Sequence, residues 1–210
     1  MPGNVSSPLK GKTIIFLGSS VTYGSAAGGQ SFVELFETLD GVKAVKETVS
    51  GTTLADTAAD SYVSRLKRLD TGMKADCVVV QLSTNDASKK LPLGDISGST
   101  ELSSFDTQTV TGAMEWIICY SRDTWDCPVI FYTGSRYDST EYAAMVSRLK
   151  ELQGKWGIGA IDLYTEDAFN DIDGESYARY MSDPIHPTKA GYSEWWFPKM
   201  EADLTRIMEQ

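Results

Sequence analysis

The chain has 210 residues, 41% of them hydrophobic and 23% charged, which is the composition of an ordered globular domain rather than of a disordered chain. Acidic residues outnumber basic ones by 29 to 19, and the net charge of −10 argues against nucleic acid and anionic membranes as partners. The three cysteines form no Cys-x-x-Cys pair and there is one histidine, so we expect no metal site and no cofactor.

The first ten residues lack the basic and then apolar order of a secretory signal peptide. We therefore expect a cytoplasmic protein, with a processed, secreted form as the alternative. The sequence leaves the oligomeric state open.

The first predicted element is a buried strand over 13–17, an apolar run that ends abruptly at Gly18-Ser19-Ser20. A Gly-Ser turn at the end of a strand has two chemical interpretations. Its backbone N–H groups can bind an anion, or one serine can act as a nucleophile. A plain strand-to-loop junction is the third interpretation.

The remaining elements alternate between helix and strand. Helices are predicted at 31–39, with Ser31 as the N-cap, then at 54–69, 105–120 and 141–152, and from 188 onward with an interruption at Pro198. Strands are predicted at 42–49, 75–82, 128–132 and 159–163. Segments 87–104 and 166–175 are predicted as loops. The predicted helix at 54–69 ends in basic residues, Arg65 among them, which match the helix dipole.

This alternation predicts an α/β domain in which helices cover both faces of a parallel sheet. The run at 75–82 is apolar throughout, as expected of a strand that is covered on both faces. With no internal repeat and no linker in the sequence, we expect one domain over residues 1–210.

Three successive predicted strands end in residues that can donate hydrogen bonds: Ser20, then Ser50-Gly51, then Asn85. Turn preference alone explains any one of them. The carboxyl ends of parallel strands meet at one edge of the sheet, where ligands bind in open α/β sheets. The three together therefore indicate a functional site.

The sole histidine, His186, lies in the segment Asp183-Pro184-Ile185-His186-Pro187. The two prolines restrict the backbone, and a carboxylate three residues before the histidine is within reach of its Nδ1. Such a carboxylate fixes the tautomer that leaves Nε2 free as a general base. A serine hydroxyl needs such a base to become a nucleophile.

Four segments together resemble the conserved blocks of the SGNH hydrolases, also called GDSL esterases/lipases. These are FLGSSVTYG at 16–24, Ser50-Gly51, STND at 83–86 and DPIHP at 183–187, in the family's order and spacing. The resemblance implies a flavodoxin-like three-layer α/β/α sandwich with a five-stranded parallel sheet of order 2-1-3-4-5.

For this sequence, the resemblance implies that Ser20 is the nucleophile, His186 the base and Asp183 the residue that orients it. The backbone N–H groups of Ser20 and Gly51 and the side chain of Asn85 would form the oxyanion hole. Two residues depart from the family's pattern: Ser19 stands where the family usually has aspartate, and Ser83 stands where it usually has glycine.

The resulting hypothesis is a serine esterase that hydrolyses carboxylic esters through an acyl-enzyme. Loop 87–104 lacks the pattern of an amphipathic lid, so short acyl groups, acetate above all, on a polar or carbohydrate alcohol are favoured over lipids. We expect a small-molecule ester as partner and no stable membrane association. The alternatives are a lipase or lysophospholipase, an acyltransferase with the same triad, and a non-catalytic flavodoxin-like binding module.

Overall fold

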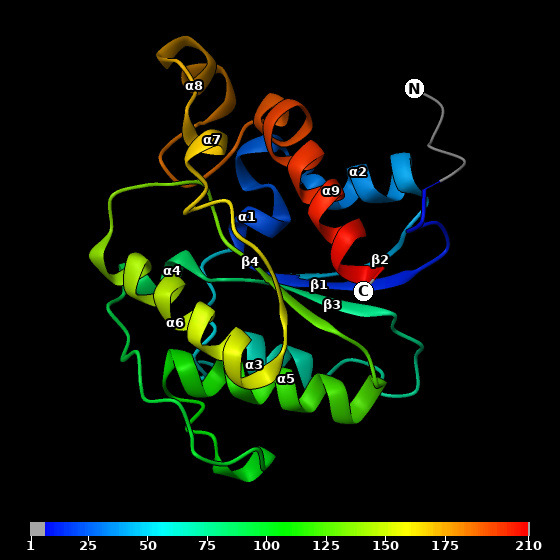
Figure 1. Cartoon of the computed structure of the whole chain (residues 1–210), viewed down its shortest axis with the longest axis vertical. Helices are drawn as coiled ribbons and strands as arrows, with labels where there is room; N and C mark the ends of the chain where they lie inside the picture. The colour runs from blue at the N-terminus through cyan, green and yellow to red at the C-terminus, as the bar shows by residue number, and fades with distance from the viewer. Residues whose placement is uncertain (1–6, 210) are drawn as a thin grey trace.

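The computed structural model describes residues 7–209, and its centre is a five-stranded sheet (Figure 1). All four strand pairs are parallel and the order is β2-β1-β3-β4-β5, so the predicted sheet and its order are confirmed. The strands are β1 (Thr13–Gly18), β2 (Lys43–Thr48), β3 (Cys77–Gln81), β4 (Val129–Tyr132) and β5 (Gly159–Ile161).

The helical segments follow the strands and lie on both faces of the sheet (Figure 1). The α-helices are α1 (Ser20–Tyr23), α2 (Phe32–Leu35), α3 (Tyr62–Leu66), α4 (Thr84–Ser88), α5 (Val110–Trp125), α6 (Thr140–Trp156), α7 (Asp167–Asn170), α8 (Gly174–Tyr180) and α9 (Phe197–Met208). The 3₁₀ segments are η1 (Ser25–Ala27) and η3 (Leu102–Ser104), and the π-helical segments are η2 (Phe36–Asp40) and η4 (Gly191–Trp196).

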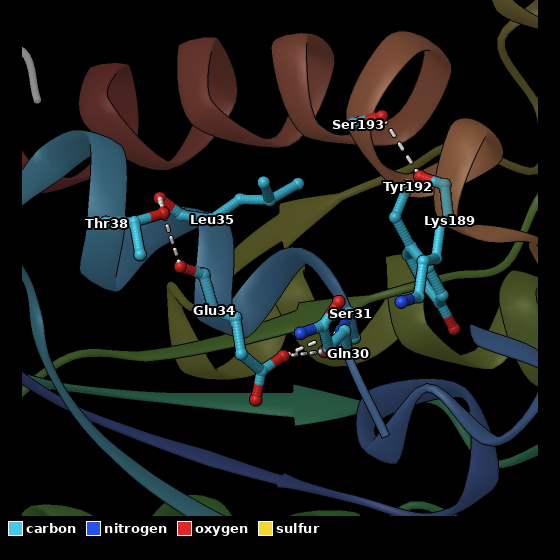
Figure 2. A pocket seen from close by; sticks show the side chains of 8 residues that line it. All are labelled: Gln30, Ser31, Glu34, Leu35, Thr38, Lys189, Tyr192 and Ser193. Atoms are coloured by element: carbon cyan, nitrogen blue, oxygen red, sulfur yellow. Dashed lines mark hydrogen bonds between the residues drawn. The ribbon is translucent and has the colours of Figure 1, made fainter. Parts of the chain in front are cut away.

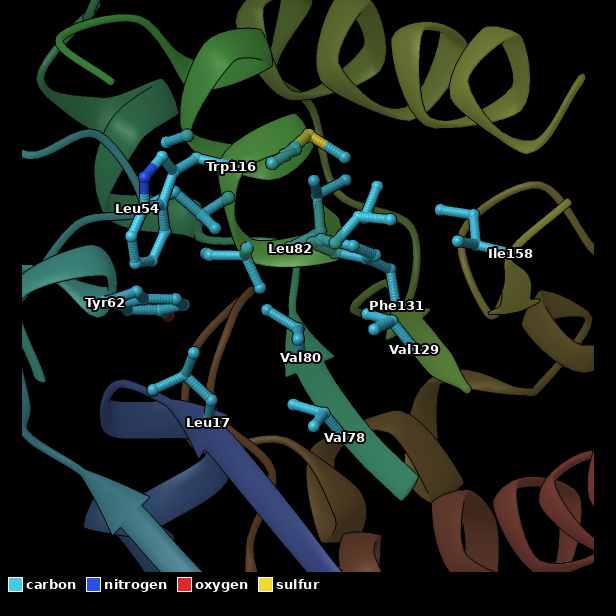
Figure 3. Packing of buried hydrophobic residues seen from close by; sticks show 14 of the residues in the cluster. Leu17, Leu54, Tyr62, Val78, Val80, Leu82, Trp116, Val129, Phe131 and Ile158 are labelled. Atoms are coloured by element: carbon cyan, nitrogen blue, oxygen red, sulfur yellow. The ribbon is translucent and has the colours of Figure 1, made fainter. Parts of the chain in front are cut away.

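The core has two layers, one on each face of the sheet. Alternate residues of a strand point to opposite faces. In β1, Ile15 and Leu17 therefore join the cluster under α3, α5 and α6 (Figure 3), whereas Ile14 and Phe16 join the cluster under α2 and α9. All four of these side chains are fully buried. This packing between two helical layers explains why β1, β3 and β4 are largely apolar, whereas the edge strand β2 carries polar residues and is only partly buried.

Several local predictions are confirmed in detail. Ser31 is the N-cap of α2: its Oγ accepts from the N–H of Val33, and its own N–H donates to the Glu34 carboxylate at 2.6 Å. The helix continues as η2 and ends at Gly41, whose φ of 70° is the left-handed conformation that glycine favours. Pro198 lies in the first turn of α9, which continues directly from η4, so the predicted interruption is a change from π-helix to α-helix.

The predicted helix over 54–69 is largely wrong, because only α3 forms there. The N–H groups of Leu54 and Ala55 donate to the carboxylate of Asp86 at 2.8 and 3.0 Å instead of entering a helix. Ser61 then caps α3 by accepting from the N–H of Ser64. A partner more than thirty residues away in the sequence therefore overrides the helical periodicity.

Other boundaries and elements also differ from the sequence prediction. The helix expected over 105–120 begins five residues later, because Thr109 caps α5 by accepting from the N–H of Gly112. Short helices α4, α7 and α8 form in segments that were predicted as loops or turns. In α8, Asp173 supplies the N-cap and accepts from the N–H of Ser176 at 2.7 Å.

Candidate active site

The turn between β1 and α1 presents Ser20 at the carboxyl edge of the sheet. Ser20 is the first residue of α1 and is 9% exposed, whereas its neighbour Ser19 is fully buried. Gly18 is required immediately before this turn, because a Cβ at that position would lie 1.8 Å from the Oγ1 of Thr22. The glycine therefore allows the strand and the helix to approach closely enough to expose a single serine.

Two hydrogen bonds join Ser20 to His186 and His186 to Asp183. The Oγ of Ser20 lies 2.8 Å from the Nε2 of His186, and the Nδ1 of His186 lies 2.8 Å from the Oδ2 of Asp183. Because an ionised carboxylate only accepts, Nδ1 carries the proton and Nε2 is the acceptor for the serine hydroxyl. The structure thus brings together three residues from opposite ends of the sequence in the geometry of a nucleophile, a base and its orienting group.

The segment that carries the histidine is held by Asp183 itself. Its Oδ1 accepts from the backbone N–H groups of Ile185 and His186 at 2.8 and 2.9 Å. Partial burial raises the pKa of Asp183, but these hydrogen bonds and the one from the imidazole outweigh that effect and leave the pKa below its usual value. Asp183 is therefore a carboxylate at neutral pH and can stabilise an imidazolium on His186.

The other two predicted residues, Gly51 and Asn85, lie beside Ser20 at the ends of β2 and β3. Gly51 has a φ of 81°, which a residue with a side chain rarely adopts. Within residues 7–209, the backbone N–H groups of Ser20 and Gly51 donate to no protein acceptor. The Nδ2 of Asn85 donates to the Oγ of Ser19 at 3.2 Å and to the carbonyl of Thr52 at 2.9 Å, so its amide has a fixed orientation.

Helix α4 fixes the loop that contains Gly51. Besides the bond from Asn85, the carboxylate of Asp86 accepts from two backbone N–H groups of this loop, and the Nζ of Lys89 donates to the carbonyl of Gly51 at 3.1 Å. Asp86 is 1% exposed, and burial raises its pKa although these hydrogen bonds oppose the rise. The three bonding residues, all on one helix, hold the donors of a candidate oxyanion hole at constant positions.

Gln81, the last residue of β3, is a positioning residue that the sequence analysis missed. Its Oε1 accepts from the backbone N–H of Ser19 at 2.9 Å and from the Oγ1 of Thr22 at 2.8 Å, with longer contacts to the N–H of Thr22 and the Oγ of Ser19. These donors lie on either side of Ser20. The polar residue near the end of the apolar run at 75–82 was the available indication, because a buried amide must find partners.

Arg65 is a second residue of this kind. The sequence predicts that it complements the dipole of the helix at 54–69, but it is 2% exposed and its guanidinium donates to backbone carbonyls. One bond goes to Gly18 at the end of β1 and another to Glu47 near the end of β2, each at 2.8 Å. Arg65 therefore holds together the ends of the two strands that precede Ser20 and Gly51.

A groove of about 270 Å³ lies between α2 and η4, on the helix layer that also contains α9 (Figure 2). Two of its polar side chains are bonded to other parts of the protein. The hydroxyl of Ser31 donates to the carbonyl of Thr22, and the carboxylate of Glu34 pairs with Lys46. Leu35 supplies an apolar wall, and none of the predicted site residues lines the groove.

Two further features bear on the class of site. Among residues 7–209, no group of three or more His, Cys, Asp or Glu side chains is arranged to hold a metal ion. Within the same described range, no helix combines the length and the apolar composition that a membrane span requires.

Comparison with known proteins identifies the family. The model of the GDSL-like Lipase/Acylhydrolase family matches residues 16–193, whereas no curated protein matches the sequence. A solved structure with 26% sequence identity superposes with a TM-score of 0.79, covering 95% of this chain and 98% of the other.

Two more distant structures share the fold. A putative GDSL-like lipase from Bacteroides ovatus has 19% identity and a TM-score of 0.64, over 94% of this chain and 98% of that one. A family two carbohydrate esterase from Clostridium thermocellum, solved in complex with cellohexaose, has 16% identity and a TM-score of 0.62, over 97% of this chain and 65% of that one.

Proposed function

The chain belongs to the GDSL-like lipase/acylhydrolase family, and on that premise we propose that it is a serine esterase that acts through a covalent acyl-enzyme. The observation that carries the proposal is the pair of 2.8 Å hydrogen bonds from Ser20 to His186 and from His186 to Asp183. Each group has the orientation that its role requires before any substrate binds.

In the first step, the Oγ of Ser20 attacks the carbonyl carbon of the ester while its proton passes to the Nε2 of His186. The carboxylate of Asp183 stabilises the imidazolium that results. The carbonyl oxygen becomes an oxyanion, which the N–H groups of Ser20 and Gly51 stabilise by hydrogen bonds. The Nδ2 of Asn85 joins them by exchanging one of its two bonds, to the Oγ of Ser19 or to the carbonyl of Thr52, for a bond to the oxyanion.

The tetrahedral intermediate then collapses. The bond to the alcohol oxygen breaks, the alcohol leaves with the proton from His186, and the acyl group remains bound to Ser20. A water molecule attacks this acyl-enzyme with His186 as its base, and the second collapse releases the carboxylic acid and restores the serine hydroxyl.

We propose esters of short acyl groups, acetate above all, on polar or carbohydrate alcohols as the substrates. The net charge of −10 opposes binding to anionic membranes, and loop 87–104 carries no amphipathic pattern that would form a lid. A carbohydrate esterase among the structures of the same fold supports the polar alcohol.

A fluorophosphonate probe tests the nucleophile directly. We expect stoichiometric labelling of Ser20, located by mass spectrometry, and no labelling of the Ser20→Ala variant. An unlabelled wild-type protein, or a label on another residue, would contradict the proposed mechanism and favour a non-catalytic binding module.

The acyl chain and the acceptor need separate measurements. We expect kcat/KM for nitrophenyl esters to be highest at acetate and to fall towards palmitate, with acetylated sugars also hydrolysed. A maximum at a chain of about eight carbons or more would contradict the short-acyl proposal. Product analysis with added alcohols separates hydrolysis from acyl transfer.

A further inference from the structure

A small hollow lies directly behind the candidate catalytic residues. It is lined by Val21, which follows the nucleophile in the chain, by Thr84, which precedes the oxyanion amide, and by Ile185, which precedes the histidine. Its volume of about 10 Å³ corresponds to about one water molecule. Three of the four segments that supply the proposed chemistry, all except the one with Gly51, therefore also supply a wall of this hollow.

The sheet order places the hollow on the side of β1 opposite to Gly51. Gly51 follows β2, on one side of β1, whereas the hollow is lined by residues that follow β3 and β4, on the other side. In an acyl-enzyme the carbonyl oxygen faces the oxyanion donors, and the alcohol leaves past His186. The acyl carbon chain is then directed towards the ends of β3 and β4, where the hollow lies.

Two buried polar atoms of the hollow's lining have no hydrogen-bond partner within the described part of the chain: the Nε2 of Gln81 and the hydroxyl of Tyr137. The end of the Gln81 amide that faces the N–H groups of Ser19 and Thr22 must be its oxygen, because both of these groups donate to it. The atom without a partner is therefore the nitrogen, Nε2. Burial raises the pKa of Tyr137 and outweighs the opposing effect of the nearby Ser139 side chain, which makes no hydrogen bond of good geometry with it, so the hydroxyl remains a neutral donor and acceptor.

A buried polar group without a partner costs about 1–3 kcal/mol, so this lining favours an occupant that can form hydrogen bonds. The volume restricts the occupant to a group of the size of a hydroxyl or a water molecule. A methyl group of similar size fits the space but leaves Gln81 Nε2 and the Tyr137 hydroxyl without partners.

We propose that the hollow is the end of the acyl subsite and binds one hydroxyl-sized hydrogen-bonding group. The inference rests on the proposed esterase function and specifies the acyl groups of its substrates, which have two carbons. With an acetyl group, a water molecule occupies the hollow. With a 2-hydroxyacetyl group, the hydroxyl of the acyl group occupies it. A longer saturated chain displaces the water without replacing its hydrogen bonds and is disfavoured.

Phenyl glycolate and phenyl propionate test the proposal, because their acyl groups differ only by a hydroxyl in place of a methyl group. Each kcat/KM is divided by the rate constant of the same ester with hydroxide, which removes the difference in intrinsic reactivity. We expect the normalised value for the glycolate to exceed that for the propionate by about tenfold, as one buried hydrogen bond allows. A normalised ratio at or below one would overturn the proposal.

The Tyr137→Phe variant removes one of the two hydrogen-bonding groups and no proposed catalytic group. We expect the glycolate preference to fall by about tenfold while kcat/KM for phenyl acetate changes much less. Tyr177→Phe, on the exposed side of α8, is the matched control and should keep the wild-type ratio. An unchanged ratio in Tyr137→Phe would overturn the proposal.

A high-resolution crystal structure of the free protein distinguishes water from a substrate hydroxyl as the occupant. We expect one ordered water within hydrogen-bond distance of Gln81 Nε2 and the Tyr137 hydroxyl, and its loss in Tyr137→Phe. A hollow without ordered density in the wild-type protein would overturn the proposal. If neither ester is hydrolysed and the fluorophosphonate leaves Ser20 unmodified, the proposed esterase function is wrong. The crystal structures then still decide whether the hollow binds a hydroxyl-sized group.

Discussion

Replacing Gln81 with leucine tests whether the turn that carries Ser20 depends on one buried amide. The leucine side chain fills nearly the same space but has no acceptor. In the wild-type protein the N–H of Ser19 and the Oγ1 of Thr22 donate to Oε1 at 2.9 and 2.8 Å. With leucine the N–H of Ser19 has no acceptor. The hydroxyls of Thr22 and Tyr132, which are hydrogen-bonded to each other, then have one proton without an acceptor. Each unpaired buried donor costs about 1–3 kcal/mol.

Part of this cost is offset, because the substitution also removes the unpartnered Nε2 of Gln81. We therefore expect the free energy of unfolding, measured by urea denaturation, to fall by about 1–4 kcal/mol. Because the lost bonds lie on both sides of Ser20, kcat for an acetyl ester should fall by about 10- to 100-fold with little change in KM.

Gln81→Glu is the control for this substitution, since it retains an oxygen where Ser19 and Thr22 donate. It should keep more of the wild-type kcat than Gln81→Leu does. If both variants lose kcat equally, or if Gln81→Leu loses stability and keeps its full kcat, the proposed connection between Gln81 and the nucleophile is wrong.

Three further predictions concern the candidate catalytic residues. Ser20→Ala and His186→Ala should each lower the rate of ester hydrolysis by roughly three to six orders of magnitude. The double variant should be little worse than either, because the two groups act as a unit. A His186→Ala enzyme that keeps more than about a tenth of the wild-type rate would contradict the triad. Asn85→Ala should lower kcat by about 10²–10³ with KM nearly unchanged, as expected of a transition-state donor, whereas an effect on KM alone would make Asn85 a substrate-binding residue. Since the pKa of Asp183 is lowered in the folded protein, its carboxylate stabilises the fold above the unfolded pKa of about 3.9, and this contribution is lost as the pH falls through the lower, folded value. The stability difference between wild type and Asp183→Asn should therefore be constant near neutral pH and shrink below about pH 4, and a difference that grows on acidification would contradict the assigned direction.

The triad could be proposed from the sequence because its special geometry is local. Asp183 and His186 lie three residues apart between two prolines, and the carboxylate binds the backbone N–H groups of that same segment. Likewise Gly18-Ser19-Ser20 follows directly on an apolar strand. Short segments of this kind constrain their own conformation, so their spacing in the sequence carries most of the information.

The residues that hold the site in place were not predicted, because their partners are distant in the chain. Asp86 binds a loop about thirty residues earlier, Gln81 binds the turn around Ser20, and Arg65 binds the ends of two strands. Periodicity describes which face of an element is buried, but it does not identify the partner of a buried polar group. For this reason Arg65 was interpreted only as a complement to a helix dipole, and 54–69 was predicted as one helix.

The serine at position 19 can be understood from these long-range contacts. An aspartate, the usual residue there in the family that the sequence resembles, would place a carboxylate where the Oγ of Ser19 lies 3.4 Å from the Oε1 of Gln81. Two acceptors would then face each other in a fully buried place, which is strongly unfavourable. The amide cannot rotate to present its Nε2 instead, because Oε1 already accepts from the N–H groups of Ser19 and Thr22.

A hydroxyl at position 19 resolves this conflict, since it can accept from the Nδ2 of Asn85 and donate to the Oε1 of Gln81. Residues 19, 81 and 85 therefore form one connected set, in which the turn that carries the proposed nucleophile and the amide of the proposed oxyanion hole are oriented by neutral groups. A neutral set has a functional consequence, because a carboxylate next to Asn85 would oppose the negative charge that develops on the oxyanion. Replacing it with a hydroxyl removes that repulsion while keeping the side-chain amide of Asn85 in a fixed orientation.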